Sequence, residues 1–170
     1  WMAAQAGLAA VLLFTLNGTA IVLGIASLAL VAVYPFAKRF TWWPQVFLGL
    51  AFNWGVLVAF AAHGGTLHPA PMLAYAAGIL WTLFYDTIYA HQDAEDDALI
   101  GVKSTARLFG QNSPRILAGF AVLTGGLLAV AILLVGRDQL MAWLGLAGFA
   151  GHLAWQLRNF QPDQGDACLR

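Results

Sequence analysis

The chain has 170 residues, of which 61% are hydrophobic and only 9% are charged, whereas a soluble domain has about 25% charged residues. A soluble domain of this length has too little interior to hide so much apolar surface, so the composition argues against a water-soluble enzyme and a disordered chain. The net charge is zero, with eight basic and eight acidic side chains, which leaves no basic surface for nucleic acid. We therefore expect an all-α protein of a membrane.

Three candidate membrane spans lie in the first half of the chain. A spanning helix needs about 20 mainly apolar residues, and the first candidate is short, as expected if its beginning is missing from the chain. The first two candidates are separated only by Asn17-Gly18, a turn signal, and the third ends at Gly64-Gly65. The three candidates cover about residues 2–16, 18–34 and 44–62.

Three further candidate spans cover about residues 71–90, 114–135 and 140–157. Asn112 or Ser113 is the predicted N-cap of the fifth span, and Pro114 occupies its first turn. No Gly/Ser-rich linker and no internal repeat interrupts the chain. The sequence thus predicts one membrane domain over residues 1–170, a polytopic helical bundle with about six transmembrane helices.

The basic residues predict which connections face the cytoplasm, because positive charge stays on that side of a membrane. The second and fourth connections and the C-terminal tail hold nearly all of them, whereas the opposite side has only Arg137, followed by Asp138. This alternation agrees with six spans and places both ends of the chain in the cytoplasm. The basic residues on that side are Lys38, Arg39, Lys103, Arg107, Arg115, Arg158 and Arg170.

Five of the eight acidic residues fall within positions 86–97, at the cytoplasmic end of the fourth span. Asp86 lies inside the apolar stretch itself. A carboxylate at membrane depth costs several kcal/mol and is by default a candidate functional residue. A solvated loop after a helix would explain Glu95 and Asp96, but it does not explain Asp86.

The spacing of the acidic residues predicts a metal site. On one continuous helix, Asp86, Asp93 and Asp97 fall within roughly 40° of one face. Asp93 and Asp97 are then one turn apart and share a divalent ion or its waters, whereas Asp86 lies about 10 Å deeper. Oxygen ligands suit Mg²⁺, which bridges carboxylates to substrate phosphates. We therefore predict Mg²⁺ at Asp93 and Asp97, and a separate role for Asp86.

Cations on the same side would complete a phosphate-binding site. Lys38 and Arg39 are candidates to bind a diphosphate beside the metal, and Lys103 is a third. Positive-inside anchoring explains Lys38 and Arg39 nearly as well, and this alternative stays open. Asn53, in the middle of the third span, needs a partner on another helix or in a cavity. The candidate substrate-binding residues are Tyr34, Lys38, Arg39, Asn53, Tyr89 and Lys103.

The motifs around the acidic cluster resemble those of a known family. They are similar to the second aspartate-rich motif of the UbiA family of intramembrane prenyltransferases, and the stretch 34–39 with Pro44-Gln45-Val46 resembles that family's cytoplasmic loop and next helix. The combination most resembles the branch that acts on 4-hydroxybenzoate in bacterial ubiquinone synthesis, and it covers about residues 5–168. The string that carries the resemblance is Tyr85-Asp86-Thr87-Ile88-Tyr89-Ala90, then Asp93, Asp96-Asp97 and Ile100-Gly101-Val102-Lys103-Ser104-Thr105-Ala106.

The resemblance implies a nine-helix bundle with two aspartate-rich motifs. The first motif, an Asn-Asp-x-x-Asp-x-x-x-Asp string, does not occur in this sequence. We therefore expect a single prenyltransferase domain that is truncated at both ends, and we expect this piece alone to be inactive.

The reaction that the resemblance implies is Mg²⁺-dependent transfer of a polyprenyl group from polyprenyl diphosphate to the ring of 4-hydroxybenzoate. Asp93 and Asp97 would hold Mg²⁺ on the diphosphate, which the candidate cations would neutralise. Asp86 would orient the aromatic acceptor or take its proton. The rings that stand nearby in sequence to stabilise the allylic cation are Trp81, Phe84 and Tyr85. The implied location is the bacterial inner membrane, with the active-site loops in the cytoplasm.

Two alternative functions remain open from the sequence. One is a sister prenyltransferase with another acceptor, such as a naphthoate, homogentisate or haem. The other is a membrane cation transporter whose pore carries Asp86 and Asp93. A transporter places its carboxylates near the bilayer midplane, whereas the acidic residues here gather at one end, which favours an enzyme that handles a phosphorylated lipid.

Overall fold

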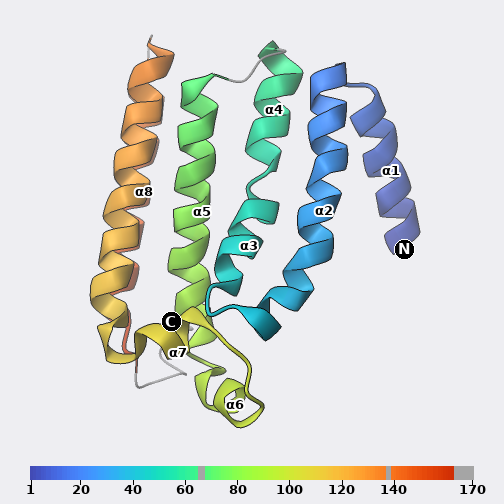
Figure 1. Ribbon diagram of the computed structural model, residues 1–170. Helices are drawn as coiled ribbons and strands as arrows, with labels where there is room; N and C mark the ends of the chain where they lie inside the picture. The colour runs from blue at the N-terminus through green and yellow to red at the C-terminus, as the bar shows by residue number, and fades with distance from the viewer. Residues whose placement is uncertain (65–67, 137–138, 163–170) are drawn as a thin grey trace.

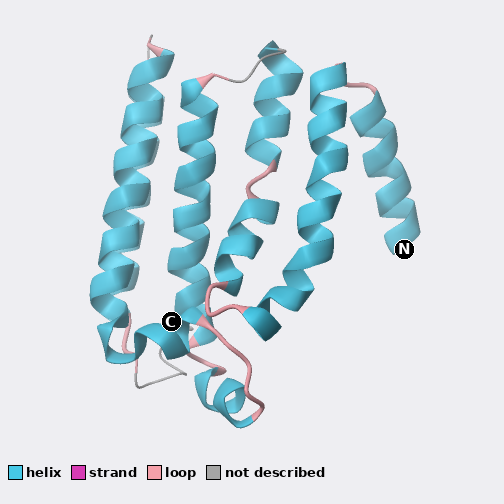
Figure 2. Ribbon diagram, in the orientation of Figure 1, coloured by secondary structure: helices cyan, strands magenta, loops and turns pink. Residues whose placement is uncertain are grey.

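The computed structural model describes residues 1–64, 68–136 and 139–162, and this part of the chain is helical without any strand (Figures 1 and 2). The predicted all-α fold is therefore confirmed. The helices are α1 (Met2–Phe14), α2 (Gly18–Phe40), α3 (Pro44–Phe52), α4 (Gly55–Gly64), α5 (Pro69–Ala90), α6 (Ala94–Leu99), α7 (Thr105–Phe109), the 3-10 turn η1 (Gly110–Asn112), α8 (Ser113–Val135) and α9 (Leu140–Asn159).

The long helices run alternately up and down, side by side (Figure 1). Helix α5 packs on α8 and on α3, α9 packs on α8, and α2 packs on both α3 and α4. The short helices α6 and α7 lie at the lower end, where α2 and α5 also end (Figure 1). This arrangement brings the end of α2, the end of α5 and the connection between α5 and α8 together.

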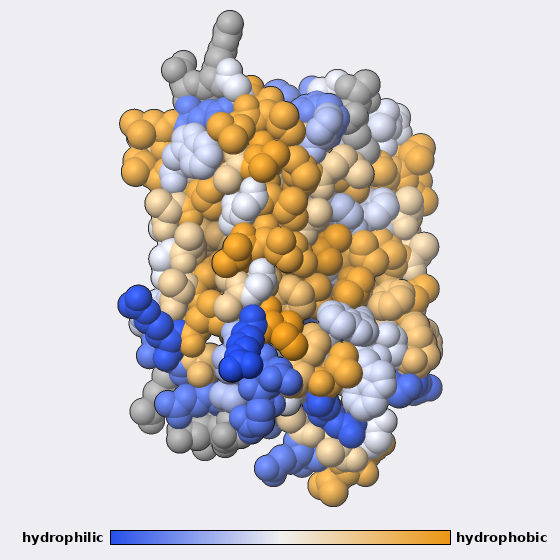
Figure 3. Space-filling model, turned by 60° about the vertical axis from the view of Figure 1, so that its left-hand side comes forward, coloured by the Kyte–Doolittle hydropathy of each residue, from blue (hydrophilic) through white to orange (hydrophobic). Residues whose placement is uncertain are grey.

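Three helical stretches are long and apolar enough to cross a membrane: Gly18–Phe40, Pro44–Gly64 and Thr105–Val135. Helices also form over the other three predicted spans, although by length and composition they do not reach that threshold, so their crossing stays a prediction. Figure 3 shows hydrophobic side chains over most of one face and the most hydrophilic ones gathered at its lower end. A membrane protein with one polar end is consistent with this distribution.

Helix α2 begins where the turn signal predicts and ends later than predicted. The side chain of Asn17 accepts a hydrogen bond from the Ala20 N–H at 3.0 Å and donates to the carbonyl of Ala61 at 2.6 Å, which ties this turn to α4. The prediction of a loop after residue 34 is wrong, because the helix continues through Pro35 to Phe40. Lys38 and Arg39 therefore lie in its last turn, where positive charges interact favourably with the helix dipole.

The third predicted span is interrupted at Asn53-Trp54, between α3 and α4. The Asn53 side chain donates to the carbonyl of Gly49 and to the Thr82 hydroxyl of α5, both at 2.9 Å. The indole N–H of Trp54 donates to the carbonyl of Leu23 in α2 at 2.8 Å. These bonds supply the polar groups at the interruption with partners from neighbouring helices, as an apolar environment requires. The structure thus gives Asn53 a helix–helix contact.

We expect Gly78→Ala to destabilise the protein by about 1–3 kcal/mol, the usual cost of overpacking. A Cβ at Gly78 would lie 2.6 Å from the Asn53 side-chain carbon Cγ, and the two hydrogen bonds of Asn53 hold that side chain in place. Gly119→Ala is the matched control, because a Cβ there meets nothing within 4 Å. Thermal unfolding in detergent measures both variants, and equal stability of the two would contradict this packing.

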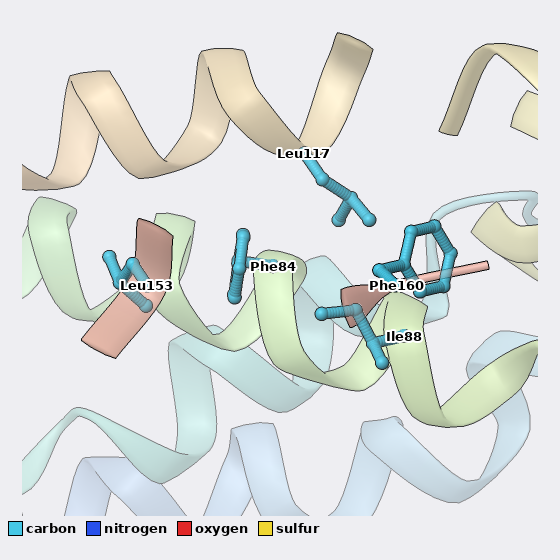
Figure 4. Close-up of a cluster of buried hydrophobic side chains, with 5 residues drawn as sticks. All are labelled: Phe84, Ile88, Leu117, Leu153 and Phe160. Carbon is cyan, nitrogen blue, oxygen red and sulfur yellow. The ribbon is translucent and has the colours of Figure 1, made fainter. Parts of the chain in front are cut away.

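A buried hydrophobic cluster joins α5, α8 and α9 just above the polar end (Figure 4). Phe84 of α5 and Leu117 of α8 are both 0% exposed. This cluster fixes α5 against α8 and α9. Helix α5 is also the helix that carries Asp86. Its members are Phe84, Ile88, Leu117, Leu153 and Phe160.

The alternation of the helices places most described basic residues of the predicted cytoplasmic side at one end, while Arg137 and Arg170 lie outside the described residues. We expect cysteines at His68 and Ala98, both exposed, to be labelled from opposite sides of the membrane. The background for this measurement is Cys168→Ser, because the chain has one cysteine. Labelling of both positions by an impermeant maleimide from the same side would contradict the alternation.

Candidate active site

Asp86 lies in the lower half of α5 and faces two other helices. Its carboxylate is close enough to the Lys38 ammonium of α2 for the two charges to interact, and the Gln45 side chain of α3 lies near the same carboxylate. The side chain is half-buried. A carboxylate, a cation and an amide from three helices thus converge on one point.

Gln45 is a site residue that the sequence analysis did not single out. It lies in the first turn of α3, next to Pro44, and is only 1% exposed. Its carbonyl oxygen Oε1 is buried without a hydrogen-bond partner among the described residues. The signal that would have found it is an amide side chain inside an apolar span, the same signal that drew attention to Asn53.

Tyr34 and Lys38 are one helical turn apart on α2 and share a face, as the spacing predicts. Tyr34 is half-buried and close to both Asp86 and Tyr85. The backbone N–H of Lys103 donates to the carbonyl of Lys38 at 3.3 Å. The structure therefore brings Tyr34 and Lys38 together with Asp86, and the backbone of Lys103 lies beside that of Lys38.

Arg39 does not face the same point. Its guanidinium lies over the Phe36 ring, 5.9 Å from the ring centre, and the side chain is exposed. The predicted Lys38-Arg39 pair therefore separates into one residue beside Asp86 and one on the outer side of α2.

The prediction of one helical face for Asp86, Asp93 and Asp97 is wrong. Helix α5 ends at Ala90, a turn follows, and a new helix starts after Asp93, which is the N-cap of α6. The depth of 10 Å assigned to Asp86 on that basis no longer applies. Within the new element, the one-turn relation of Asp93 and Asp97 holds, because the Asp97 N–H donates to the Asp93 carbonyl at 2.8 Å. Asp93 is exposed, whereas Asp97 is 8% exposed.

Buried hydrogen bonds of His91 end helix α5. Its Nδ1 lies 2.7 Å from the Thr87 carbonyl, which only accepts, so Nδ1 donates; its Nε2 lies 3.0 Å from the Ser113 hydroxyl of α8. Burial lowers the pKa of His91, and the bond to Thr87 opposes this effect. The ring also meets Phe160 edge-on at 5.0 Å. A neutral imidazole with both nitrogens occupied holds the two helices together and is not free to bind a metal.

Arg107 and Thr105 fix the segment that follows the acidic residues. The guanidinium of Arg107 donates to the backbone carbonyl of Asp97 at 3.2 Å and to the carbonyl of Val102. The hydroxyls of Thr105 and Thr87 lie 2.6 Å apart in a buried contact. The sequence analysis used Arg107 only for orientation and missed this role. The connection from α5 to α8 is thereby held to the end of α5 and positions Asp97.

Trp42, in the loop after α2, contacts both Lys103 and Arg107 of the connection between α5 and α8. The Lys103 ammonium lies 5.9 Å and the Arg107 guanidinium 5.4 Å from the centre of a Trp42 ring. Cation–π contacts of this kind hold a cation in place without neutralising it. The Lys103 ammonium is therefore held against the loop that follows α2.

Asp93 and Asp97 are the candidate ligands of the predicted metal site. Among the described residues, no group of three or more Asp, Glu, His or Cys side chains is placed to hold a metal ion. Asp93 and Asp97 offer two carboxylates. This donor set fits an ion that takes its remaining ligands from water and substrate phosphates, as Mg²⁺ does.

Tyr89 lines a groove of about 420 Å³ that α5 forms with α9 and the end of α3. Trp81 and Tyr85 line the same groove, and their rings meet edge-on at 5.3 Å. Phe84 belongs to the buried cluster instead and is not available to stabilise a cation. The residues that line the groove are Phe52, Trp81, Tyr85, Tyr89, His152 and Gln156.

Comparisons with known proteins agree on one family. The model of the UbiA prenyltransferase family matches residues 1–170. A mitochondrial 4-hydroxybenzoate polyprenyltransferase of cattle is 45% identical over 170 residues, which are 99% of this chain and 45% of the relative. The enzyme of the same name from Arabidopsis thaliana is 45% identical over 163 residues, 94% of this chain and 39% of the relative. No solved structure matches.

These relatives correct the predicted location. The chain spans less than half the length of the curated relatives just named. They are eukaryotic enzymes that carry the word mitochondrial in their names. Their names contradict the prediction of a bacterial inner membrane, which is therefore wrong.

Proposed function

The chain belongs to the UbiA prenyltransferase family, and on that premise we propose that it forms part of an enzyme that prenylates 4-hydroxybenzoate. The observation that carries the proposal is the meeting of Asp86 with Lys38 and Gln45 at the same end as Asp93 and Asp97. The substrates are a polyprenyl diphosphate and 4-hydroxybenzoate, which the named relatives support. The enzyme lies in a lipid bilayer, which the long apolar helices of the described residues support.

Lys38 and Lys103 bind the diphosphate. Their backbones are hydrogen-bonded to each other, so a positive charge from the last turn of α2 and one from the loop before α7 reach one substrate group. As the allylic C–O bond breaks, its electron pair leaves with the diphosphate oxygen, and these cations stabilise the negative charge that develops there. The ring carbon ortho to the phenol hydroxyl then forms the new C–C bond and releases its proton.

Asp86 acts on the aromatic acceptor. It lies beside Lys38 and is half-buried, so it is within reach of an acceptor that approaches a bound diphosphate. A carboxylate in this place accepts a hydrogen bond from the phenol hydroxyl, orients the ring, or takes the proton that leaves the ring carbon.

Asp93 and Asp97 would hold Mg²⁺ through their carboxylates, one turn apart at the start of α6. When bound, the ion supplies charge neutralisation on the leaving diphosphate. Arg107 keeps the Asp97 backbone in place from the α7 side. Tyr34 lies one turn before Lys38 on α2 and near Asp86, where its hydroxyl contacts substrate.

Prenyl transfer by the full-length protein in liposomes tests the proposal. We expect labelled polyprenyl diphosphate to prenylate 4-hydroxybenzoate, with activity lost in EDTA and restored by Mg²⁺. Product with a naphthoate, homogentisate or haem acceptor, and none with 4-hydroxybenzoate, would favour a sister prenyltransferase. Transport of a cation without any prenylated product would overturn the enzymatic proposal.

A further inference from the structure

The end of α2 and the loop that follows it contact the connection between α5 and α8 at three points. The backbone N–H of Lys103 donates to the carbonyl of Lys38 at 3.3 Å. Trp43 meets Phe109 of α7 edge-on, with ring centres 5.3 Å apart. The third contact is that of Trp42 with two cations. The first two contacts already join the segments, so attachment alone does not account for a third contact that gathers positive charge.

Two like charges share the indole of Trp42. The Lys103 ammonium and the Arg107 guanidinium lie 5.9 Å and 5.4 Å from a ring centre of this residue. The indole attracts each cation, but the two cations repel each other. Both side chains are half-buried, so water screens this repulsion less than at an exposed site. A bound anion would relieve the repulsion, so the arrangement favours a negatively charged ligand.

The two cations are held in different ways. The guanidinium of Arg107 donates to the carbonyl of Asp97 at 3.2 Å and to that of Val102, so the backbone of the connection fixes it in place. The ammonium of Lys103 has no hydrogen-bond or ion-pair partner among the described residues, and its one contact there is the ring of Trp42. Arg107 thus anchors the ring, and the ring in turn holds Lys103.

We propose that Trp42 is a positioning residue that holds the Lys103 ammonium in place for binding of the diphosphate. The indole carries no formal negative charge, so it does not repel an arriving phosphate as a carboxylate partner would. The ring fixes the end of the lysine side chain, while the carbonyl of Lys38 fixes its backbone. The inference rests on the proposed function, because the diphosphate is that of the proposed reaction.

Trp42→Leu and Trp42→Phe in the full-length protein test the inference. Both variants keep an apolar side chain, but only phenylalanine keeps a ring face that attracts a cation. We expect Trp42→Leu to lower affinity for polyprenyl diphosphate about 10-fold, and Trp42→Phe to stay within about 3-fold of the unchanged protein. Affinity for 4-hydroxybenzoate should stay within about 3-fold in both. Equilibrium binding of each labelled substrate measures these effects, and equal losses of diphosphate affinity in the two variants would overturn the inference.

Competition by inorganic diphosphate separates the diphosphate group from the prenyl chain. We expect inorganic diphosphate to compete about 10-fold less well in Trp42→Leu than in the unchanged protein, because the proposed contact is with the charged group. If this competition were unchanged while binding of polyprenyl diphosphate fell, Trp42 would act on the prenyl chain, and the inference would be wrong.

Trp143→Leu is the matched control. Trp143 of α9 is 37% exposed, close to the 38% of Trp42, and it contacts no cation among the described residues. This variant should leave the affinity for polyprenyl diphosphate unchanged. A loss as large as that of Trp42→Leu would contradict the inference, since it would then follow from the removal of any partly exposed tryptophan.

A double-mutant cycle with Lys103→Met tests whether Trp42 acts through Lys103. We expect Trp42→Leu to lower diphosphate affinity much less in the Lys103→Met protein than in the unchanged one, and losses that multiply would overturn the inference. If Trp42→Leu does not accumulate, Trp42→Met also lacks a ring and takes its place in each comparison. Absence of 4-hydroxybenzoate transfer by the unchanged protein would overturn the proposed function as well, whereas normal transfer with unchanged diphosphate affinity in Trp42→Leu would overturn the inference alone.

Discussion

Asp93→Ala or Asp97→Ala in the full-length protein is expected to lower prenyl transfer by at least ~100-fold, because each removes a charged ligand of a doubly charged ion. Asp93 is exposed and makes no side-chain capping bond in α6, so its loss should leave the fold intact. Transfer rates at saturating and limiting Mg²⁺ measure the effect, and added Mg²⁺ should restore part of the Asp93→Ala activity.

Asp96→Ala is the control for both variants. Asp96 is exposed and lies beside Asp97 in α6, whereas Asp97 is 8% exposed and faces the connection that Arg107 holds. We expect the Asp96 change to cost less activity than either of the others. If it were the most damaging of the three, the assignment of Asp93 and Asp97 as the metal pair would be wrong.

Asp86→Asn is expected to lose much of the transfer rate and of the affinity for 4-hydroxybenzoate, while it keeps most binding of the prenyl diphosphate and Mg²⁺. Asparagine fills the same space, but it carries no negative charge beside Lys38 and takes no proton. The loss of a group that accepts a proton costs about 100-fold or more in rate. Steady-state rates and equilibrium binding of each substrate separate the two effects.

The competing role for Asp86 is that of a third metal ligand. The break between α5 and α6 speaks against it, because the carboxylate faces Lys38 and Gln45, which are not metal-binding partners of the acidic pair. Mg²⁺-dependent binding of prenyl diphosphate to the Asp86→Asn protein distinguishes a metal ligand from a residue that acts on the acceptor. If that binding fell as far as in Asp93→Ala, Asp86 would belong to the metal site.

The sequence predicts the helices where local signals mark their ends. Asn17 caps α2, and Pro114 stands in the first turn of α8, which has Asn112 as its N-cap. Helices α2 and α8 therefore begin within one or two residues of the predicted positions. The alternation of basic loops is also visible from the sequence alone, because it depends on composition and not on contacts.

The candidate site is less predictable, because long-range contacts decide it. The helix that carries Asp86 stops at Ala90 because His91 bonds to Ser113 of α8 and packs on Phe160, residues far away in the chain. No glycine or proline in the sequence marks the end of this helix, so a prediction from helical periodicity continues the helix through Asp97. The position of Gln45 near Asp86 is likewise not predictable from the sequence. It depends on the packing of α3 on α5, and an amide in an apolar stretch does not indicate which group it will contact.

The two buried side-chain contacts that connect α5 to the following segment have an entropic consequence. Thr87 meets Thr105, and His91 meets Ser113, so the chain between them is closed into a loop when the protein folds. The conformational entropy of this loop is lost at that stage. A diphosphate that arrives later finds Asp97 and Lys103 already ordered and does not bear that cost, so more of its contact energy remains as affinity.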